Sequence, residues 1–313
     1  MLSRIADSLF WLNRYMERSD CLTRIIRTSY ILSFDASEKA DFTWRDVLQL
    51  CGATQEEEVL ELGRQMETAL DYLICNTSNI NSIRVLVSRA RENARGVQDN
   101  ITKEVWEEIN QLYHVVNAPT VTQQITGLRA LEIIDRLDQC NTLYYGVADN
   151  TMPRGQGWNF MNLGKFIERC ILTIDNSLAH FGKIQFELGA AQDILFWRHL
   201  LLSLSGYELY LKKYTRGLHN MNVLDHILFN QDFPRSLIYS LSRIRRYLDF
   251  IIDDTKMEGS ERLQKNFGRI CSKVEFADLN TIQETGVQGF LYPLRQDLVE
   301  FSNQLTRIYF SYA

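Results

Sequence analysis

Apolar residues recur at three- and four-residue spacing through most of the chain, and this spacing predicts a mainly helical protein. The first such segment runs from Ser3 to about Ser33, and its apolar residues cover more than one side of the predicted helix. A helix that is apolar over most of its circumference is buried on several sides. We therefore expect this first helix to run through the core.

The same spacing predicts a series of further helices, with boundaries marked by capping residues, glycine and proline. They cover Thr43–Gly52, Glu56–Cys75, Asn79–Val97, Thr102–Val116, Val121–Ala148, Trp158–Phe181, Leu188–Tyr214, Val223–Asn230, Pro234–Asp254, Glu261–Phe276 and Asp278–Tyr312. Pro119 should close one helix, and Pro293 should kink or divide the last segment. The clearest predicted loop is Thr151–Gly157, between the two halves of the chain.

Composition supports an all-α fold and narrows the possible functions. Only 4 Pro and 16 Gly occur in 313 residues of which 45% are apolar, and no alternating run with a hairpin turn is present. The formal charge of −5 gives no electrostatic footprint of a nucleic-acid binder. The most apolar run, Ile194–Leu204, is too short to span a bilayer, and the N-terminus does not resemble a secretory signal. Six widely spaced cysteines fit free thiols in a reducing compartment. We expect a cytoplasmic protein without a membrane segment.

The chain contains an internal repeat with a period of about 150 residues. A Glu-Arg dipeptide occurs twice within an apolar helical pattern, 151 residues apart, and in both copies it is preceded by an aromatic residue and by a cation three residues before the Glu. The matched positions are Arg14 with Lys165, Glu17 with Glu168, Arg18 with Arg169, Asn79 with Asn230, Arg84 with Arg235, and Trp44-Arg45 with Trp197-Arg198, the last at an offset of 153. We predict two related helical-bundle units, 1–150 and 151–313, packed around an approximate two-fold axis as one globular body.

Several of these stretches resemble the alpha-E family of bacterial proteins. They are Arg14-Tyr15-Met16-Glu17-Arg18, Ala90-Arg91-Glu92-Asn93-Ala94-Arg95, Gly157-Trp158 through Glu168-Arg169, and Phe233-Pro234-Arg235-Ser236. The resemblance covers essentially the whole chain and implies an all-helical domain with a Glu-Arg motif. It also implies an association with circularly permuted ATP-grasp ligases and transglutaminase-like proteins. Asn13, Ser19-Asp20 and Lys165 depart from the family pattern, and lysine cannot make the planar bidentate contact of arginine.

The charged residues of the repeat allow two interpretations. In the structural one, Glu17 and Glu168 pair with arginines in a buried ion network that fixes how the halves dock. In the functional one, a Glu acts as base or orients a pocket for carboxylate or phosphate groups. That pocket would be formed by Arg14, Arg18, Arg84, Lys165, Arg169 and Arg235, supported by Asn79, Asn230, Trp44, Arg45, Trp197 and Arg198.

No cofactor or metal site is expected, because no histidine has a glutamate three residues before it, the spacing used by carboxylate-bridged metal centres in helical bundles. Nor does a Ser-His-Asp or Cys-His arrangement stand out. Three functions remain open. The resemblance implies an accessory or co-catalytic partner of an ATP-grasp-type carboxylate-amine (peptide) ligase. The alternatives are an enzyme that binds an anionic substrate between the two halves and a structural oligomerisation module.

Overall fold

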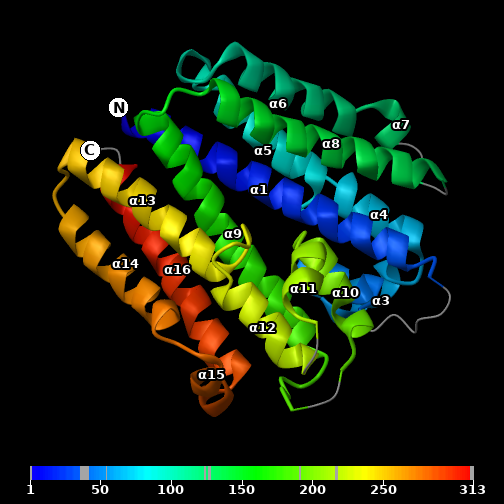
Figure 1. Cartoon of the computed structure of the whole chain (residues 1–313). Coiled ribbons are helices and arrows are strands. Elements are labelled where there is room, and N and C mark those ends of the chain that lie inside the picture. Colours follow the sequence, from blue (N-terminus) through cyan, green and yellow to red (C-terminus); the bar gives the residue numbers. More distant parts are fainter. Residues whose placement is uncertain are drawn as a thin grey trace. The chain divides into compact units, whose positions relative to one another are not determined.

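The computed structural model describes residues 2–35, 42–53, 55–122, 125, 128–189, 192–215 and 218–310. All regular elements in these ranges are helices, so the predicted all-α fold is confirmed for the described residues (Figure 1). None of the described helices combines the length and the apolar character needed to cross a bilayer. The chain divides into two compact units, which are described separately.

The N-terminal unit, Trp11–Arg154, contains most of the first long helix and the helices that follow it. In order these are α1 (Ser3–Leu32), α2 (Trp44–Leu50), α3 (Glu56–Leu62), α4 (Met66–Ile74), α5 (Ile83–Arg95), a 3-10 turn at Gln98–Asn100, α6 (Lys103–Val116), α7 (Pro119–Thr122) and α8 (Leu128–Thr151). Helix α6 packs against α5 and α8, and α1 is hydrogen-bonded to α8 through Asn13 and Tyr144. Four long helices, α1, α5, α6 and α8, therefore form a bundle with three short helices after the first.

The C-terminal unit comprises Gly155–Ala313 together with Met1–Phe10. Its helices are α9 (Gln156–Gly182), α10 (Ile194–Ser203), α11 (Tyr207–Lys213), α12 (His219–Phe229), α13 (Leu237–Thr255), α14 (Ser260–Glu275), α15 (Leu279–Thr285) and α16 (Val287–Tyr309). Helix α9 packs against α13 and α16, and α14 packs against the same two helices. This unit is also a bundle of four long helices, with three short helices after the first.

The units divide after Arg154, and not at residue 150 as expected, and the start of the chain belongs to the C-terminal unit. Contacts at both places account for this division. Helix α8 continues to Thr151, and the Arg154 side chain donates a hydrogen bond of 3.0 Å to Asp149, so residues 151–154 stay with the N-terminal unit. At the other end, the Phe10 ring lies 5.2 Å from the ring of Phe310. Ring packing of this kind is consistent with the place of α1 up to Phe10 in the C-terminal unit.

Helix α1 is buried along most of its length, as its sequence predicts: Leu12, Met16, Leu22 and Ile26 are each at most 4% exposed. Several other predicted helices are divided. The segment Glu56–Cys75 breaks at Gly63, where an added Cβ would lie 2.6 Å from Cγ of Arg45. The close approach of this side chain therefore requires glycine, which also favours the end of a helix.

Two later breaks fall where the backbone is left-handed. The predicted helix Leu188–Tyr214 is interrupted at Ser205, whose φ is 55°, before α11 begins at Tyr207. The last segment divides at Gly286, whose φ is 78°, while Pro293 lies inside α16. Of the two predicted effects of Pro293, a kink or a division, the division is wrong, because the residue that leaves the helical conformation is a glycine.

Other boundaries differ by a few residues from those that the sequence predicts. Helix α5 begins at Ile83 rather than Asn79, because the side chain of Ser82 caps it. Helix α13 begins at Leu237, three residues after Pro234, and its cap is Ser236. Pro119 opens α7 instead of closing α6, in keeping with the preference of proline for the first helical position.

Candidate functional site

The Glu-Arg pairs lie at matching places in the two first helices of the units. At an offset of 151 residues the buried positions of α1 fall on buried positions of α9. Examples are Leu9 and Phe160, Leu12 and Leu163, Met16 and Ile167, Ser19 and Cys170, Ile26 and Ser177, and Tyr30 and Phe181. Glu17 and Glu168 belong to the same pattern, and each is 1% exposed. The repeat that the sequence indicates therefore coincides with a repeat in burial along these helices.

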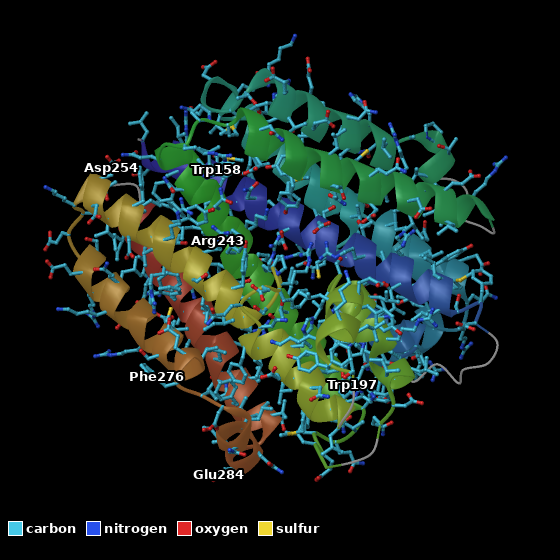
Figure 2. All side chains as sticks on the ribbon, viewed as in Figure 1. Trp158, Trp197, Arg243, Asp254, Phe276 and Glu284 are labelled. Carbon is cyan, nitrogen blue, oxygen red and sulfur yellow. The ribbon has the colours of Figure 1, made fainter. Side chains whose placement is uncertain are left out.

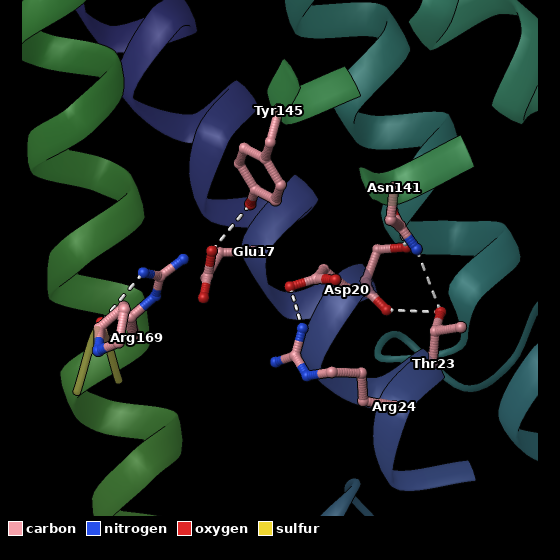
Figure 3. Close-up of polar contacts among 9 residues, drawn as sticks. Glu17, Asp20, Thr23, Arg24, Asn141, Tyr145 and Arg169 are labelled. Atoms are coloured by element: carbon pink, nitrogen blue, oxygen red, sulfur yellow. Dashed lines mark hydrogen bonds and ion pairs between the residues drawn. The ribbon is translucent and has the colours of Figure 1, made fainter. Parts of the chain in front are cut away.

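Glu17 accepts a hydrogen bond from a tyrosine of its own unit. The hydroxyl of Tyr145, on α8, lies 2.9 Å from a carboxylate oxygen of Glu17 (Figure 3). Hydrogen bonds to a charged acceptor are among the stronger ones in proteins. This contact ties the centre of α1 to α8.

Glu168 lies near an ion pair that joins α9 to α16. The guanidinium of Arg295 donates to both carboxylate oxygens of Asp175, over 2.5 and 3.0 Å. The hydrogen bond that Arg295 donates to Asp175 raises the pKa of Arg295, and the negative charge of Glu168 adds to this shift. Both glutamates of the Glu-Arg pairs are therefore buried, and each acts on a residue of the last long helix of its own unit: Glu17 through the hydrogen bond from Tyr145, and Glu168 through its charge on Arg295.

The arginines of the two pairs hold corresponding turns. Arg18 donates to the side-chain oxygen of Asn81 over 3.1 Å, and Asn81 lies directly before the cap of α5. Arg169 donates to the backbone oxygen of Pro234 over 3.3 Å, two residues before the cap of α13 (Figure 3). In both units the arginine thus fastens the turn that begins the second long helix.

Asn79 and Asn230 shape the same two turns. The side-chain oxygen of each accepts the backbone N–H two residues later, from Asn81 over 2.9 Å and from Asp232 over 3.0 Å. Their amide nitrogens reach back to the preceding helix, to the oxygen of Tyr72 and to Nδ1 of His226. Both side chains are buried and hydrogen-bonded in the way that asparagine favours in turns. Their role within each unit is to connect a short helix to a long one.

The alignment of Arg84 with Arg235 is wrong in the structure. The caps Ser82 and Ser236 are 154 residues apart, and at this offset the buried positions of α5 and α13 coincide. Arg84 lies inside the first turn of α5, whereas Arg235 precedes the cap of α13. The turn after Asn230 is three residues longer than the turn after Asn79, and this difference in length accounts for the change of offset from 151 to 154.

The alignment of Trp44-Arg45 with Trp197-Arg198 also fails. Trp44 is the first residue of α2, and Trp197 is the fourth residue of α10. Trp197, labelled in Figure 2, is fully buried and donates a hydrogen bond of 2.9 Å to Asn220, whereas Trp44 is half-buried. Arg45 is exposed and Arg198 is half-buried. The two Trp-Arg dipeptides therefore lie at positions that do not correspond in the two units.

The offset of 154 reveals two matched arginines that the sequence comparison missed. Arg89 corresponds to Arg243, and Arg91 corresponds to Arg245. Arg91 donates to Asn110 on α6, and Arg245 forms an ion pair of 2.8 Å with Glu275 on α14. Measuring the distance from the capping serine of each helix, rather than applying one offset to the whole chain, would have found both pairs.

Arg14 and Lys165, the matched cations that precede the Glu-Arg pairs, lie near aromatic rings. The guanidinium of Arg14 is 4.6 Å from the ring centre of Trp11, and Nζ of Lys165 is 5.6 Å from that of Phe166. Arg169 lies 5.0 Å from the same phenylalanine ring. Within each unit these cations therefore line one side of the helix together with an aromatic residue.

The ion pairs between the first and last long helices have opposite polarity in the two units. In the N-terminal unit, α1 contributes the cation: Arg27 forms an ion pair with Asp135 on α8. The positive charge of Arg24, also on α1, lowers the pKa of Asp138 on α8, although that pKa is raised overall. That pKa is raised by burial first and by Asp20 second; Asp20 itself pairs with Arg24 (Figure 3). In the C-terminal unit the first helix contributes the anion instead.

Two surface hollows occur in the C-terminal unit away from the residues described above. One, of about 870 Å³, lies between the end of α13 and the start of α14 and includes Lys256 and Glu258. The other, of about 420 Å³, is formed by residues 185–189, 282–283 and 285–289. Neither is lined by a charged residue of the Glu-Arg repeat. Among the described residues, no group of three or more His, Cys, Asp or Glu side chains is placed to hold a metal ion.

Comparison with known protein families decides the relationship of this chain. A family model described as a predicted alpha-helical domain with a conserved ER motif matches residues 1–310. The chain belongs to the Alpha-E family. The Glu-Arg pairs of α1 and α9 agree with the motif in this description, and the helical fold agrees with its class.

Curated relatives of this Alpha-E chain occur in mycobacteria. Uncharacterised proteins of Mycobacterium bovis and of Mycobacterium tuberculosis are each 22% identical to it over 315 residues, which cover 95% of this chain and 34% of the relative. The chain thus spans about a third of the length of the curated relatives that it matches. No solved structure is significantly similar to it.

Proposed function

We propose that this Alpha-E protein is an accessory or co-catalytic partner of an ATP-grasp-type carboxylate-amine (peptide) ligase. The observation that carries the proposal is the length of the mycobacterial relatives, in which the region similar to this chain makes up only 34% of the protein. In those proteins the region similar to this chain is joined to further polypeptide of about twice its length. The family resemblance implies that ligases of the ATP-grasp type are its associates.

The contacts of the Glu-Arg repeat within each unit favour a binding protein over an enzyme. Arg18 and Arg169 hold turns, and Glu17 is engaged by Tyr145. Groups that are buried and hydrogen-bonded in this way stabilise a scaffold. We place the protein in the cytoplasm because the cysteines Cys21, Cys51, Cys75, Cys140, Cys170 and Cys271 are all free thiols.

We also infer that the two units descend from one duplicated unit. Each consists of a long helix, three short helices and then three long helices with one short helix before the last. The buried positions match at offsets of 151 between α1 and α9 and of 154 between α5 and α13. Between α6 and α14 the offset is 158, as for Val105 with Leu263 and Ile109 with Phe267. These small changes of offset correspond to insertions in the connecting turns.

Reciprocal affinity purification tests the proposed partnership. The Alpha-E protein and the ATP-grasp ligase encoded nearest to it are each tagged in turn and used to recover the other from cells of the source organism. We expect recovery in near-stoichiometric amounts in both directions. A transglutaminase-like protein encoded nearby serves as a comparison. If neither orientation recovers the ligase, or if only the transglutaminase-like protein is recovered, the proposed partner is wrong.

A further inference from the structure

Arg89 and Arg243 occupy the same place in the two units. Each is the seventh residue after the serine that caps its helix, Ser82 for α5 and Ser236 for α13. The buried positions around them match as well, since Val87 and Ala90 in α5 correspond to Leu241 and Ile244 in α13. Both arginines therefore project from the same side of the second long helix.

An aromatic ring lies beneath each of these guanidinium groups. Arg89 is 5.8 Å from the ring centre of Tyr15, on α1. Arg243 is 4.9 Å from the ring centre of Tyr239 and donates a hydrogen bond of 2.8 Å to its hydroxyl. The ring of Tyr239 in turn lies 6.4 Å from that of Phe166, which corresponds to Tyr15 at the offset of 151. Contact with an aromatic face holds the guanidinium in a defined orientation without neutralising its charge.

The fold accounts for the neighbouring pair of matched arginines but not for this one. Arg91 and Arg245 are engaged by Asn110 and Glu275 on the next long helix, so they connect two helices of the bundle. Within the described parts of the chain, neither Arg89 nor Arg243 forms an ion pair with a carboxylate. Arg89 is exposed and Arg243 is half-buried, so a ligand can reach both. Each of these guanidinium groups therefore keeps a positive charge that no carboxylate of the described residues neutralises, and a carboxylate from outside the chain can bind it.

We propose that Arg89 and Arg243 each bind a carboxylate of an acidic peptide segment of the protein partner. This rests on the proposed function and assigns two residues to it that the Glu-Arg motif does not include. A guanidinium forms bidentate hydrogen bonds with a carboxylate, and an adjacent aromatic ring favours the apolar stem of a glutamate side chain. A net charge of −5 disfavours a nucleic acid, which carries far more negative charge than a short acidic segment of a protein.

Binding of a fluorescent oligoglutamate peptide to the whole chain tests this proposal. We expect saturable binding measured by fluorescence anisotropy, with an affinity at least tenfold lower for the double variant Arg89→Gln/Arg243→Gln. The matched control is Arg95→Gln/Arg246→Gln, which removes the same charge from exposed positions of the same two helices. This control should bind within about twofold of the unaltered protein, as expected for charges outside the site. Circular dichroism melts of both double variants establish that they are folded.

The proposal is overturned if the unaltered chain does not bind the peptide, or if both double variants lose affinity equally. Equal losses would mean that the peptide responds to overall charge alone. The same variants then enter the affinity purification with the ligase. Recovery that is unaffected by Arg89→Gln/Arg243→Gln would refute the role of these arginines while leaving the partnership intact. Failure of the unaltered chain to recover the ligase would refute the partnership itself.

Discussion

Reversing the ion pair between Asp175 and Arg295 gives a direct measure of how the C-terminal unit is held together. The pair joins α9 to α16 by two hydrogen bonds, and the two side chains are 26% and 36% exposed. Replacing Arg295 by Asp removes a bidentate charge-assisted contact and places two carboxylates together. Loss of such a contact costs roughly 1–3 kcal/mol. Like charges about 4 Å apart near a surface repel by at most about 4 kcal/mol, and partial exposure lets the side chains move apart.

We therefore expect Arg295→Asp and Asp175→Arg each to lower the free energy of unfolding by about 2–4 kcal/mol. The double variant Asp175→Arg/Arg295→Asp should lose less than about 1 kcal/mol, because the pair is restored with opposite polarity. It would then have the polarity of the N-terminal unit, in which Arg24 and Arg27 on the first helix face Asp135 and Asp138 on the last. Urea denaturation followed by circular dichroism measures all three values.

A more exposed pair of the same unit provides the control for this experiment. Lys273 and Asp297 join α14 to α16, with side chains 52% and 36% exposed. Reversing Lys273 alone should cost under about 1 kcal/mol, as is usual for surface ion pairs. The reasoning is refuted if Arg295→Asp costs no more than this control. It is also refuted if the double variant is as unstable as the single ones.

Two further predictions concern acid and the helix caps. Burial lowers the pKa of His226 to about 4, and burial together with neighbouring His180 lowers the pKa of His199, so the unfolded chain binds protons that the folded chain does not. The free energy of unfolding should consequently fall as the pH is lowered from about 6.5 to 5, by up to ~1.4 kcal/mol per pH unit for each histidine. A flat profile in urea titrations over this range would contradict the prediction. Ser82→Ala and Ser236→Ala remove the side-chain acceptors that cap α5 and α13 and should each cost about 1 kcal/mol, whereas Ser242→Ala, at an exposed site on α13, should cost under about 0.5 kcal/mol. Thermal melts measure these losses, and a loss of stability in only one of the two cap variants would contradict the prediction that both serines cap their helices.

The sequence predicts the long helices and the match between α1 and α9, because both depend on the local spacing of apolar residues. It identifies α1 as a core helix and places Glu17 and Glu168 at matching positions, both of which are 1% exposed in the structure. It does not reveal the breaks at Gly63 and Ser205. The first depends on the approach of Arg45 from another helix, and the second on a local left-handed conformation. Neither is encoded in the spacing of apolar residues.

The candidate site was harder to predict because the offset between matching positions of the two units is not constant along the chain. A constant offset of 151 pairs Arg84 with Arg235, although one lies after and the other before the cap of its helix. The extra three residues before Ser236 hide the correspondence of Arg89 with Arg243. The roles of Arg18 and Arg169 also emerge only when distant turns come together in the fold, because their partners Asn81 and Pro234 are more than 60 residues away.

The central claim is that the Glu-Arg pairs belong to the packing of the units and that function lies in binding a partner. Its most direct test is the change in the free energy of unfolding caused by Glu17→Gln, measured once in the otherwise unaltered chain and once in a chain that already carries Tyr145→Phe. Neutralising a buried carboxylate that accepts the hydroxyl of Tyr145 should lower stability by about 1–2 kcal/mol, and by less when the hydroxyl is already removed. Unchanged stability of Glu17→Gln would contradict the claim and indicate that the carboxylate is kept for chemistry instead.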